Sequence, residues 1–274
     1  MRELDEIIAE TMGSTVLGSF PVGGGCIHDA SFLELADGRK LFVKSGARAH
    51  LLNAERMGLE LLAPHIRVPA LLAWGEGWLA LEWMEFRPLG RDGSLDLGKQ
   101  LAALHSVTAD EHGLDHDNFI GATPQINRRS ASWIEFYQNC RLLPQLELAA
   151  RNRRVLPVSR ILSTAAKLLA DHEPQPALLH GDLWSGNTAA LPDGDAVVFD
   201  PAPYFGDPET DLAMLELFGG SLTSEFLDGY GRVSKQRECR RPLYDLYHAL
   251  NHLNLFGSGY TGMVRRCLSD LGVV

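Results

Sequence analysis

The segment HGDLWSGN at 180–187 holds the residues whose types and spacing most directly suggest chemistry. Its Asp182 and Asn187 lie five positions apart, in a loop that follows the apolar run 177–179. In kinase-type phosphoryl transfer, an Asp accepts the proton of the substrate hydroxyl and an Asn five residues later holds a metal ion. A polar turn without a catalytic role has the same composition, so the motif alone leaves both interpretations open.

A second acidic residue, Asp200, ends the apolar run 196–199, thirteen residues after Asn187. Carboxylate and amide oxygens from two loops suit Mg²⁺, which keeps several waters and shares phosphate oxygens with its substrate. The spacing therefore predicts that Asn187 and Asp200 hold one magnesium site. The alternative is that Asp200 only caps the turn before Pro201.

The N-terminal part of the chain offers a cation and a glycine turn. Lys44 lies on a predicted strand and Glu55 on the helix that follows, an arrangement in which kinases hold a phosphate-binding Lys with a Glu. Glu60 is a less favoured partner for Lys44. Gly23, Gly24 and Gly25 would let backbone amides approach phosphates, although the run lacks the GK[ST] ending of P-loop NTPases. A surface Lys, a surface Glu and an ordinary turn are the alternatives.

The composition of the chain argues against several other classes of function. The 274 residues carry a net charge of −10, whereas nucleic-acid binders concentrate positive charge. The four cysteines lie far apart and suit neither a zinc site nor a disulfide scaffold. No secretory leader is evident, and the longest uncharged stretch, 246–264, contains His, Asn and Gly and is a poor membrane span. We expect a cytoplasmic protein that binds neither nucleic acid nor membrane.

Two kinds of hydrophobic pattern divide the chain. Residues 1–12 read as a helix, and the stretch that follows reads as strands, with an Asp37-Gly38 hairpin turn. Alternation in the next strand places Phe42 and Lys44 on one face and Leu41 and Val43 on the other. The remaining pattern predicts helices and short strands, namely helix 49–62, strands 70–77 and 78–85, helices 95–105, 132–150 and 156–171, strands 177–179 and 196–199, and helices from Asp211, Ser224 and Pro242 onward.

The order of these elements predicts an α+β fold of two unequal lobes. Residues 1–85 form a small N-terminal lobe built on an antiparallel sheet, and residues 86–274 form a larger, mainly helical C-terminal lobe. No flexible linker separates the two parts, so we expect them to be closely joined around a cleft. Clefts between lobes are common ligand sites.

The ordered set of glycine turn, strand Lys, helix Glu, Asp-x₄-Asn and strand-Asp resembles the fructosamine kinase (ketosamine-3-kinase) family. These enzymes are relatives of the aminoglycoside phosphotransferases and share a protein-kinase-like bilobal fold. The similarity extends over nearly the whole chain, and Trp184 and the segment DPAPYFGDPETDLAM resemble fructosamine kinases more than aminoglycoside kinases. The matching words are GGGCI at 23–27, FVK at 42–44, GLDHDNFIGATPQIN at 113–127, WIEFYQNCRLLPQL at 133–146, LLHGDLWSGN at 178–187, FDPAPYFGDPETDLAM at 199–214 and LYHALNHLNLFG at 246–257.

The resemblance implies a role for each matching residue. Asp182 would be the catalytic base, Asn187 and Asp200 the magnesium ligands, and Lys44 with Glu55 the pair that positions ATP phosphates. The segment Glu82, Trp83 and Met84 would be the hinge, where backbone groups pair with adenine. Trp184 and Asp207 are candidates for acceptor binding, although Asp207 and Glu209 are better placed to brace the loops.

The same resemblance implies ATP and Mg²⁺ as cofactors and a ketosamine as the small-molecule acceptor. Phosphorylation of its 3-hydroxyl would destabilise the adduct and lead to protein deglycation. A kinase of the same fold that acts on another sugar, an aminoglycoside or an amino-alcohol is the main alternative. A silent nucleotide-binding module is a further one.

Two positions raise questions of their own. Arg128 and Arg129 stand where the family usually carries an aromatic and acidic stretch. If they line the acceptor site they would disfavour a cationic amine, whereas solvated surface arginines would have no such effect. Cys26, in the glycine turn, would be either an oxidisable thiol close to phosphate-binding amides or a small residue that fits a tight turn.

Overall fold

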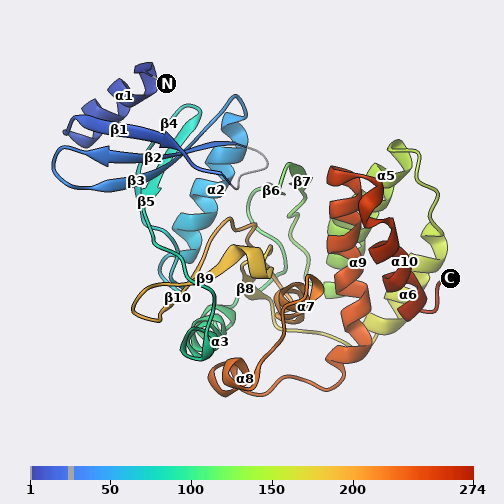
Figure 1. The fold of residues 1–274 in the computed structure, drawn as a ribbon. Helices are drawn as coiled ribbons and strands as arrows, with labels where there is room; N and C mark the ends of the chain where they lie inside the picture. The colour runs from blue at the N-terminus through green and yellow to red at the C-terminus, as the bar shows by residue number, and fades with distance from the viewer. Residues whose placement is uncertain (1, 24–27) are drawn as a thin grey trace.

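The computed structural model describes residues 2–23 and 28–274, so Gly24, Gly25 and Cys26 lie outside the described residues. A five-stranded antiparallel sheet, in the order β1-β2-β3-β5-β4, forms the N-terminal lobe (Figure 1). Its side chains pack against helix α1 on one face and helix α2 on the other. The elements of this lobe are α1 (Arg2–Met12), β1 (Val16–Pro21), β2 (Asp29–Leu35), β3 (Lys40–Ser45), α2 (Ala49–Leu62), β4 (Leu71–Gly75) and β5 (Trp78–Glu82).

Strand β3 confirms the predicted alternation. Leu41 and Val43 are buried beneath α1, while Phe42 packs with the hydrophobic cluster beneath α2 and Lys44 points to the same side. Gly38, at the turn between β2 and β3, has a φ of 87°, a left-handed conformation that glycine adopts without a steric penalty. The pattern of the sequence therefore places Lys44 on the side of the sheet that faces the C-terminal lobe.

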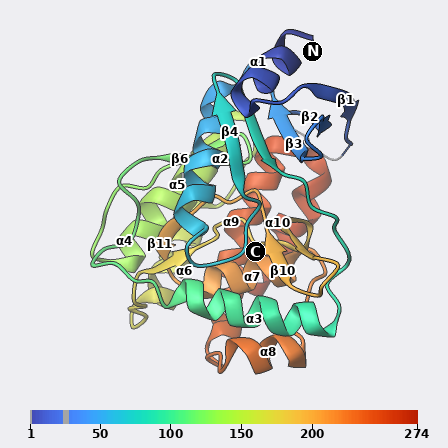
Figure 2. The same cartoon turned by 90° about the vertical axis from the view of Figure 1, so that its left-hand side faces the viewer.

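Helices dominate the C-terminal lobe, and three two-stranded sheets, β6–β7, β8–β11 and β9–β10, lie among them (Figures 1 and 2). No helix in the described ranges has the length and hydropathy that crossing a bilayer requires. The elements are α3 (Arg91–His105), β6 (Asn118–Ile120), β7 (Thr123–Gln125), α4 (Trp133–Tyr137), α5 (Leu143–Arg151), α6 (Val158–Leu169), β8 (Ala177–Leu179), β9 (Thr188–Ala190), β10 (Ala196–Val198), β11 (Tyr204–Gly206), α7 (Glu209–Leu217), α8 (Ser224–Tyr230), α9 (Arg237–Phe256) and α10 (Thr261–Asp270).

Several predicted helix boundaries are corrected by the structure. The helix predicted at 132–150 is α4 and α5 joined by a π-helical turn at Gln138–Leu142, because Pro144 has no N–H to donate to the Cys140 carbonyl. That carbonyl accepts a hydrogen bond from the Arg141 side chain instead. Helix α9 begins at Arg237, so Pro242 lies inside it and does not start it.

Helix α2 also contacts the C-terminal lobe. A Cβ atom at Gly58 would lie 3.1 Å from Pro203 and 3.2 Å from Pro201, so a larger side chain there would separate the helix from the segment that follows Asp200. Near its first turn, the rings of His50 and Phe119 lie 5.2 Å apart. The helix that carries Glu55 is therefore held by both lobes. The lobe boundary at residues 85 and 86 remains a prediction.

Helices α3 and α8 approach so closely that only glycine fits at their contact. A Cβ at Gly98 would lie 2.2 Å from the Phe226 carbonyl oxygen, and one at Gly229 would lie 2.2 Å from the Leu95 carbonyl oxygen. Backbone atoms cannot move aside as a flexible side chain can. This contact sets the distance between the two helices (Figure 2).

The Gly98→Ala variant tests this contact. Alanine favours a helix by about 1 kcal/mol over glycine, but the clash with α8 should reverse the sign and destabilise the protein by about 2 kcal/mol. Gly262→Ala is the matched control, because nothing lies within 4 Å of a Cβ at that position of α10. Urea unfolding should show Gly262→Ala neutral or stabilised. Equal stability of the two variants would contradict the packing argument.

Candidate active site

Lys44 of β3 links three segments of the chain. Its Nζ donates a hydrogen bond to Glu55 Oε1 of α2 at 2.7 Å and a second one to Asp200 Oδ1, just beyond β10. The Lys44 and Glu55 side chains are largely buried, whereas the Asp200 side chain is 49% exposed. Glu60, the less favoured partner in the sequence, instead pairs with Arg56 at 2.7 Å. The structure thus brings the predicted Lys44–Glu55 pair together and adds Asp200 to it.

Lys44 attracts both carboxylates of this cluster, which repel each other. Burial alone would lower the pKa of Lys44, but the Asp200 and Glu55 carboxylates outweigh it and raise that pKa. Burial likewise acts to raise the pKa of Asp200, and the Lys44 ammonium reverses the direction and lowers it. Lys44 is therefore a cation and Asp200 an anion at neutral pH. One oxygen of the half-exposed Asp200 carboxylate accepts from Lys44, and the other has no Lys or Arg partner among the residues that the structure describes.

Asp182 and Asn187 lie in the loop between β8 and β9. The Asn187 Nδ2 donates to the Asp182 carbonyl oxygen at 2.9 Å and approaches Asp182 Oδ2 at 3.4 Å. Because the amide nitrogen turns toward Asp182, Asn187 Oδ1 is left as an acceptor. The Phe199 N–H donates to the Asn187 carbonyl oxygen at 3.1 Å, which places this loop beside the residue that precedes Asp200.

The environment of Asp182 favours its protonated form. Burial, reinforced by repulsion from Asp200, raises the pKa of Asp182 to about 7, although the hydrogen bond from Asn187 opposes the shift. The repulsion arises because both carboxylates carry negative charge when ionised. A group with this pKa can accept a proton near neutral pH.

Asp200 has an unusual backbone conformation. Its φ is 56°, in the left-handed region, which Asp tolerates better than most residues other than glycine. The next residue is Pro201, which fixes its own φ and has no N–H. The preceding Phe199 stacks on Phe86, with ring centroids 4.9 Å apart. The sharp turn at Asp200 allows its carboxylate to reach Lys44 while the chain continues under α2.

Asp211 of α7 is a site residue that the sequence analysis missed. It is 1% exposed, and its two carboxylate oxygens accept the backbone N–H groups of His180 at 2.8 Å and Gly181 at 2.9 Å. Burial would raise the pKa of Asp211, but the hydrogen bond and charge of His105 reverse the direction and lower it. The ionised carboxylate therefore fixes the start of the loop that carries Asp182.

A hydrogen-bonded chain of His105 and Tyr230 (the relay) supports the Asp211 carboxylate. His105 Nε2 lies 3.2 Å from Asp211 Oδ2, and His105 Nδ1 lies 2.8 Å from the Tyr230 hydroxyl. His105 ends α3 and Tyr230 ends α8, so the close contact of those helices fixes the relay.

Gly181 has a φ of 82°, and a Cβ there would lie 1.9 Å from the Ala202 carbonyl oxygen. Only glycine can occupy this position of the loop.

The predicted adenine-binding segment lies at the end of β5. The Glu82 carboxylate accepts from Arg67 Nη2 at 2.8 and 2.9 Å, and the Glu82 N–H donates to the Ala70 carbonyl oxygen at 2.9 Å. The Trp83 ring meets Phe32 edge-on at 4.6 Å. The Met84 N–H has no partner among the residues that the structure describes. Gly23, the one described residue of the glycine turn, is exposed.

The two candidate acceptor residues have different surroundings. Trp184 is partly exposed beside the catalytic loop, where its ring covers Gly186 and lies 5.7 Å from Phe218. Asp207 is 2% exposed, and its carboxylate accepts the Tyr244 hydroxyl and contacts His172, each at 2.6 Å. These contacts favour a bracing role, and acceptor binding by Asp207 stays a prediction. The same bracing role suits Glu209, which pairs with Arg240.

The two arginines that depart from the family pattern do not present a joint positive charge. Arg129 Nη2 pairs with Asp115 at 2.8 Å, and its guanidinium lies 5.9 Å from the centre of the Phe205 ring. Arg128 is exposed. The pairing with Asp115 balances the charge of Arg129 but not that of Arg128.

Comparison with known proteins covers almost the whole chain. The model of the fructosamine kinase family matches residues 1–272. The chain belongs to the fructosamine kinase family. As a member of this family, it is an ATP-dependent phosphotransferase that acts on a hydroxyl group.

Individual relatives cover most of the chain. A Synechocystis protein named "Probable ketoamine kinase" is 43% identical over 90% of this chain and 89% of its own length. A rice protein (Oryza sativa subsp. indica) named "Protein-ribulosamine 3-kinase, chloroplastic" is 37% identical over 96% of this chain and 81% of its own length.

Solved structures share the fold. A Thermobifida fusca crystal structure, named as a "putative fructosamine-3-kinase", has a TM-score of 0.90 and 33% identity, with all of both chains covered. A choline kinase of Streptococcus pneumoniae has a TM-score of 0.68 at 18% identity, covering 99% of this chain and 100% of its own, and shows the fold alone. These likenesses confirm the predicted protein-kinase-like α+β fold, with its small antiparallel sheet and helical body.

Replacing Asp211 by Asn tests its role as a positioning residue. Asn offers one acceptor oxygen where Asp offers two, and its NH₂ group would face a backbone N–H of the catalytic loop. We expect kcat to fall by about 10–100-fold with little change in ATP affinity, because the loop would lose its alignment. Asp207→Asn, a buried carboxylate on another network, is the matched control and should lower stability more than it lowers kcat. Similar kcat values for the two variants would contradict this role.

Proposed function

We propose that this chain phosphorylates the 3-hydroxyl of a ketosamine, a fructosamine or ribulosamine carried by an amine such as lysine, and that this step initiates protein deglycation. The observation that carries the proposal is the cluster of Lys44, Glu55 and Asp200 beside the Asp182 loop, in a chain that matches the fructosamine kinase family throughout. The names of the ketoamine and ribulosamine kinase relatives support this class of acceptor.

The geometry supports a division of labour within the site. Lys44, held as a cation by two carboxylates, is placed to contact ATP phosphates, and Glu55 fixes its direction. Backbone groups of Glu82, Trp83 and Met84 would pair with adenine. The glycine turn at 23–25 would lie over the phosphates. These roles explain why the lysine is buried in an ion cluster and not exposed to solvent.

The donor set also fits Mg²⁺. Asn187 Oδ1 and the other carboxylate oxygen of Asp200 are the hard oxygen ligands that this ion prefers. Burial is the main cause of the raised pKa of Asp182 and repulsion from Asp200 adds to it, and a cation held beside the two carboxylates would offset that repulsion. When bound, Mg²⁺ would offset the charge of the phosphates during transfer. We assign Asn187 and Asp200 as the residues that would hold it.

Asp182 would act on the acceptor. Its carboxylate would accept a hydrogen bond from the attacking hydroxyl and take the proton as the oxygen bonds to the γ-phosphorus and the bond to the ADP oxygen breaks. Asp211 keeps the loop in place, so that Asp182 is aligned before the acceptor binds. Trp184 offers an aromatic face at the edge of this loop, which suits the apolar face of a sugar-derived acceptor.

Measuring ADP release with a panel of acceptors tests the proposal. Fructoselysine and ribuloselysine should support turnover only when Mg²⁺ is present, and an aminoglycoside should not. Turnover with the aminoglycoside alone would establish the alternative acceptor class. Nucleotide binding without ADP release on any acceptor would indicate a silent module. Asp182→Ala should abolish turnover and leave ATP binding nearly intact, whereas equal loss of both would mean that Asp182 is structural.

The pH dependence of kcat/KM gives an independent test. Because burial and Asp200 raise the pKa of Asp182 to about 7, the base should become protonated as the pH falls. We therefore expect kcat/KM to fall below about pH 7. Raising the Mg²⁺ concentration should move this limb to lower pH, since a nearby cation favours the carboxylate.

Glu55 is the control for that profile. Burial also raises the pKa of Glu55 to about 7, even though Lys44 acts to lower it. Glu55→Gln should lower the rate but retain the acid limb, because Asp182 is unchanged. Loss of the limb in Glu55→Gln would assign it to Glu55 and remove this support for Asp182 as the base.

A further inference from the structure

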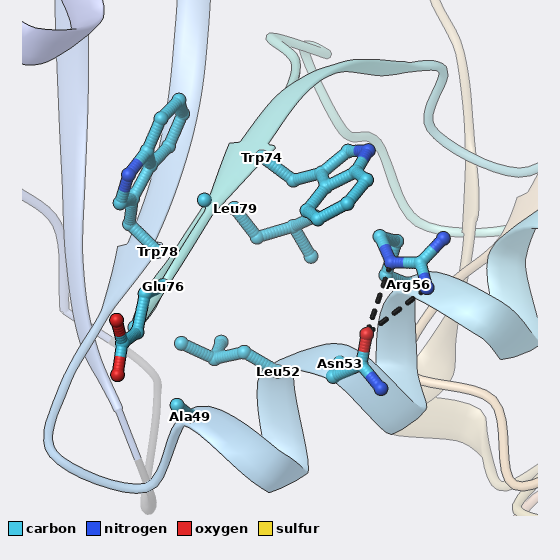
Figure 3. Close-up of a pocket in the computed structure, with 10 residues that line it drawn as sticks. Ala49, Leu52, Asn53, Arg56, Trp74, Glu76, Trp78 and Leu79 are labelled. Atoms are coloured by element: carbon cyan, nitrogen blue, oxygen red, sulfur yellow. Dashed lines mark hydrogen bonds between the residues drawn. The ribbon is translucent and has the colours of Figure 1, made fainter.

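A pocket opens on the N-terminal lobe between α2 and the turn that joins β4 to β5 (Figure 3). Its volume is about 230 Å³. Leu52 of α2 and Leu79 of β5 form its apolar base and are almost completely buried. Trp74 of β4 stands at its edge and is 55% exposed. Since a cavity of about 150 Å³ can bind benzene, this pocket has room for one aromatic ring and a short polar arm.

The polar groups of the pocket are concentrated at one end. The Arg56 guanidinium lies 4.5 Å from the centre of the Trp74 ring, and its Nε and Nη2 donate to Asn53 Oδ1 at 3.2 and 3.0 Å (Figure 3). These bonds turn the Asn53 amide so that its NH₂ group points away from Arg56 (Figure 3). The contact of that NH₂ group is the Met57 sulfur at 3.7 Å, which is a weak acceptor. A strong acceptor on a ligand would therefore find a donor already oriented.

The Arg56 end of the pocket offers hydrogen-bond donors to an anion, although Glu60 balances the charge of Arg56. Arg56 uses Nη1 to pair with Glu60 one turn along α2, and Glu60 does not line the pocket. Nη2 of Arg56 has a further N–H beyond the one given to Asn53, and it adjoins the Asn53 amide. Glu76, the acidic residue of the lining, lies at the opposite end of the pocket from Arg56 (Figure 3). A carboxylate would fit the Arg56 end and be repelled from the Glu76 end, which fixes the direction of a ligand.

We infer that this pocket is a binding site for a small aryl carboxylate. The ring lies against Trp74, Leu52 and Leu79, and the carboxylate accepts hydrogen bonds from Asn53 Nδ2 and Arg56. Such a ligand bridges α2 and the β4–β5 hairpin at the place where side chains leave a gap between them. Each contact is of a kind already present in the pocket, since Trp74 stacks with Arg56 and Asn53 hydrogen-bonds to it.

The site is coupled to the lysine cluster through α2. Arg56 adjoins Glu55, whose carboxylate holds Lys44 at 2.7 Å. The same helix packs through Gly58 on Pro201 and Pro203, beyond Asp200. A ligand that fixes α2 on the sheet therefore favours the paired position of Glu55 and should tighten nucleotide binding. This consequence rests on the proposed function, whereas the binding of the aryl carboxylate does not.

Titration of the full chain with phenylacetate, followed by ligand-observed NMR, tests the site directly. We expect a dissociation constant of about 1 mM, as suits ten heavy atoms at about 0.4 kcal/mol each. Asn53→Asp keeps the oxygen that Arg56 contacts but replaces the NH₂ donor by an anion, so phenylacetate should bind at least about fivefold more weakly. Benzyl alcohol, which lacks the charge, should lose less than about twofold. Equal weakening of both probes, or none, would overturn the proposed direction of the ligand.

Two variants on β4 distinguish the loss of the Trp74 contact with the ligand ring from a general effect of shortening an exposed side chain on this strand. Trp74→Ala should weaken phenylacetate and benzyl alcohol alike, because it removes the aromatic wall. Leu72→Ala is the matched control, an exposed apolar residue of the same strand that does not line the pocket, and it should bind both probes as the parent chain does. Undiminished binding to Trp74→Ala would show that phenylacetate lies elsewhere and would overturn the site.

The coupling is measured by the ATP dissociation constant and not by turnover. Saturating phenylacetate should tighten ATP binding about two- to fivefold in the parent chain and leave it unchanged in Asn53→Asp. Unchanged ATP affinity in the parent chain, with phenylacetate bound, would overturn the coupling. Failure of every ketosamine to support ADP release, with phenylacetate binding intact, would refute the proposed function and leave the site standing.

Discussion

The buried ammonium of Lys44 is the charge on which the arrangement of the site depends. A lone cation in this position would lose its hydration without compensation, and Glu55 and Asp200 supply that compensation from two other segments. The three residues belong to β3, α2 and the turn after β10, which lie far apart in the chain. The ion cluster therefore forms only when the sheet, the helix and the C-terminal lobe are all correctly placed. Removing one partner would leave charge buried near the middle of the molecule.

A second buried charge holds the catalytic side of the cleft. Asp211 compensates its desolvation with two backbone N–H groups and with His105, and the Tyr230 hydroxyl completes the relay. The relay begins where α3 and α8 meet at Gly98 and Gly229. The position of Asp182 is thus determined by helix packing some distance from the cleft. Mutations at that packing contact would act on the reaction without touching ATP or the acceptor.

The sequence predicts the parts of this molecule that carry a repeated pattern or a family motif. Alternation in β3 placed Lys44 correctly, and helical spacing placed Glu55 on the following helix. The three-residue strands β6, β7, β9 and β11 were missed because they are short and not uniformly aliphatic, whereas the equally short β8 and β10 are aliphatic throughout and were predicted. Asp211 was missed for a different reason. A carboxylate that accepts backbone N–H groups pairs with no particular residue type, so nothing in the sequence identifies its partners.

The tight seating of α2 on the segment after Asp200 limits how this site can change shape. In that segment Pro201 and Pro203 have fixed φ angles, and both press against Gly58 without room for a Cβ at ordinary contact distance. Reversing the direction of the Asp200 side chain would require the helix and the prolines to separate first. Inhibitors that bind by trapping an inverted metal-binding segment would therefore have to separate α2 from Pro201 and Pro203. Selective inhibitors are better designed against the site in the conformation described above.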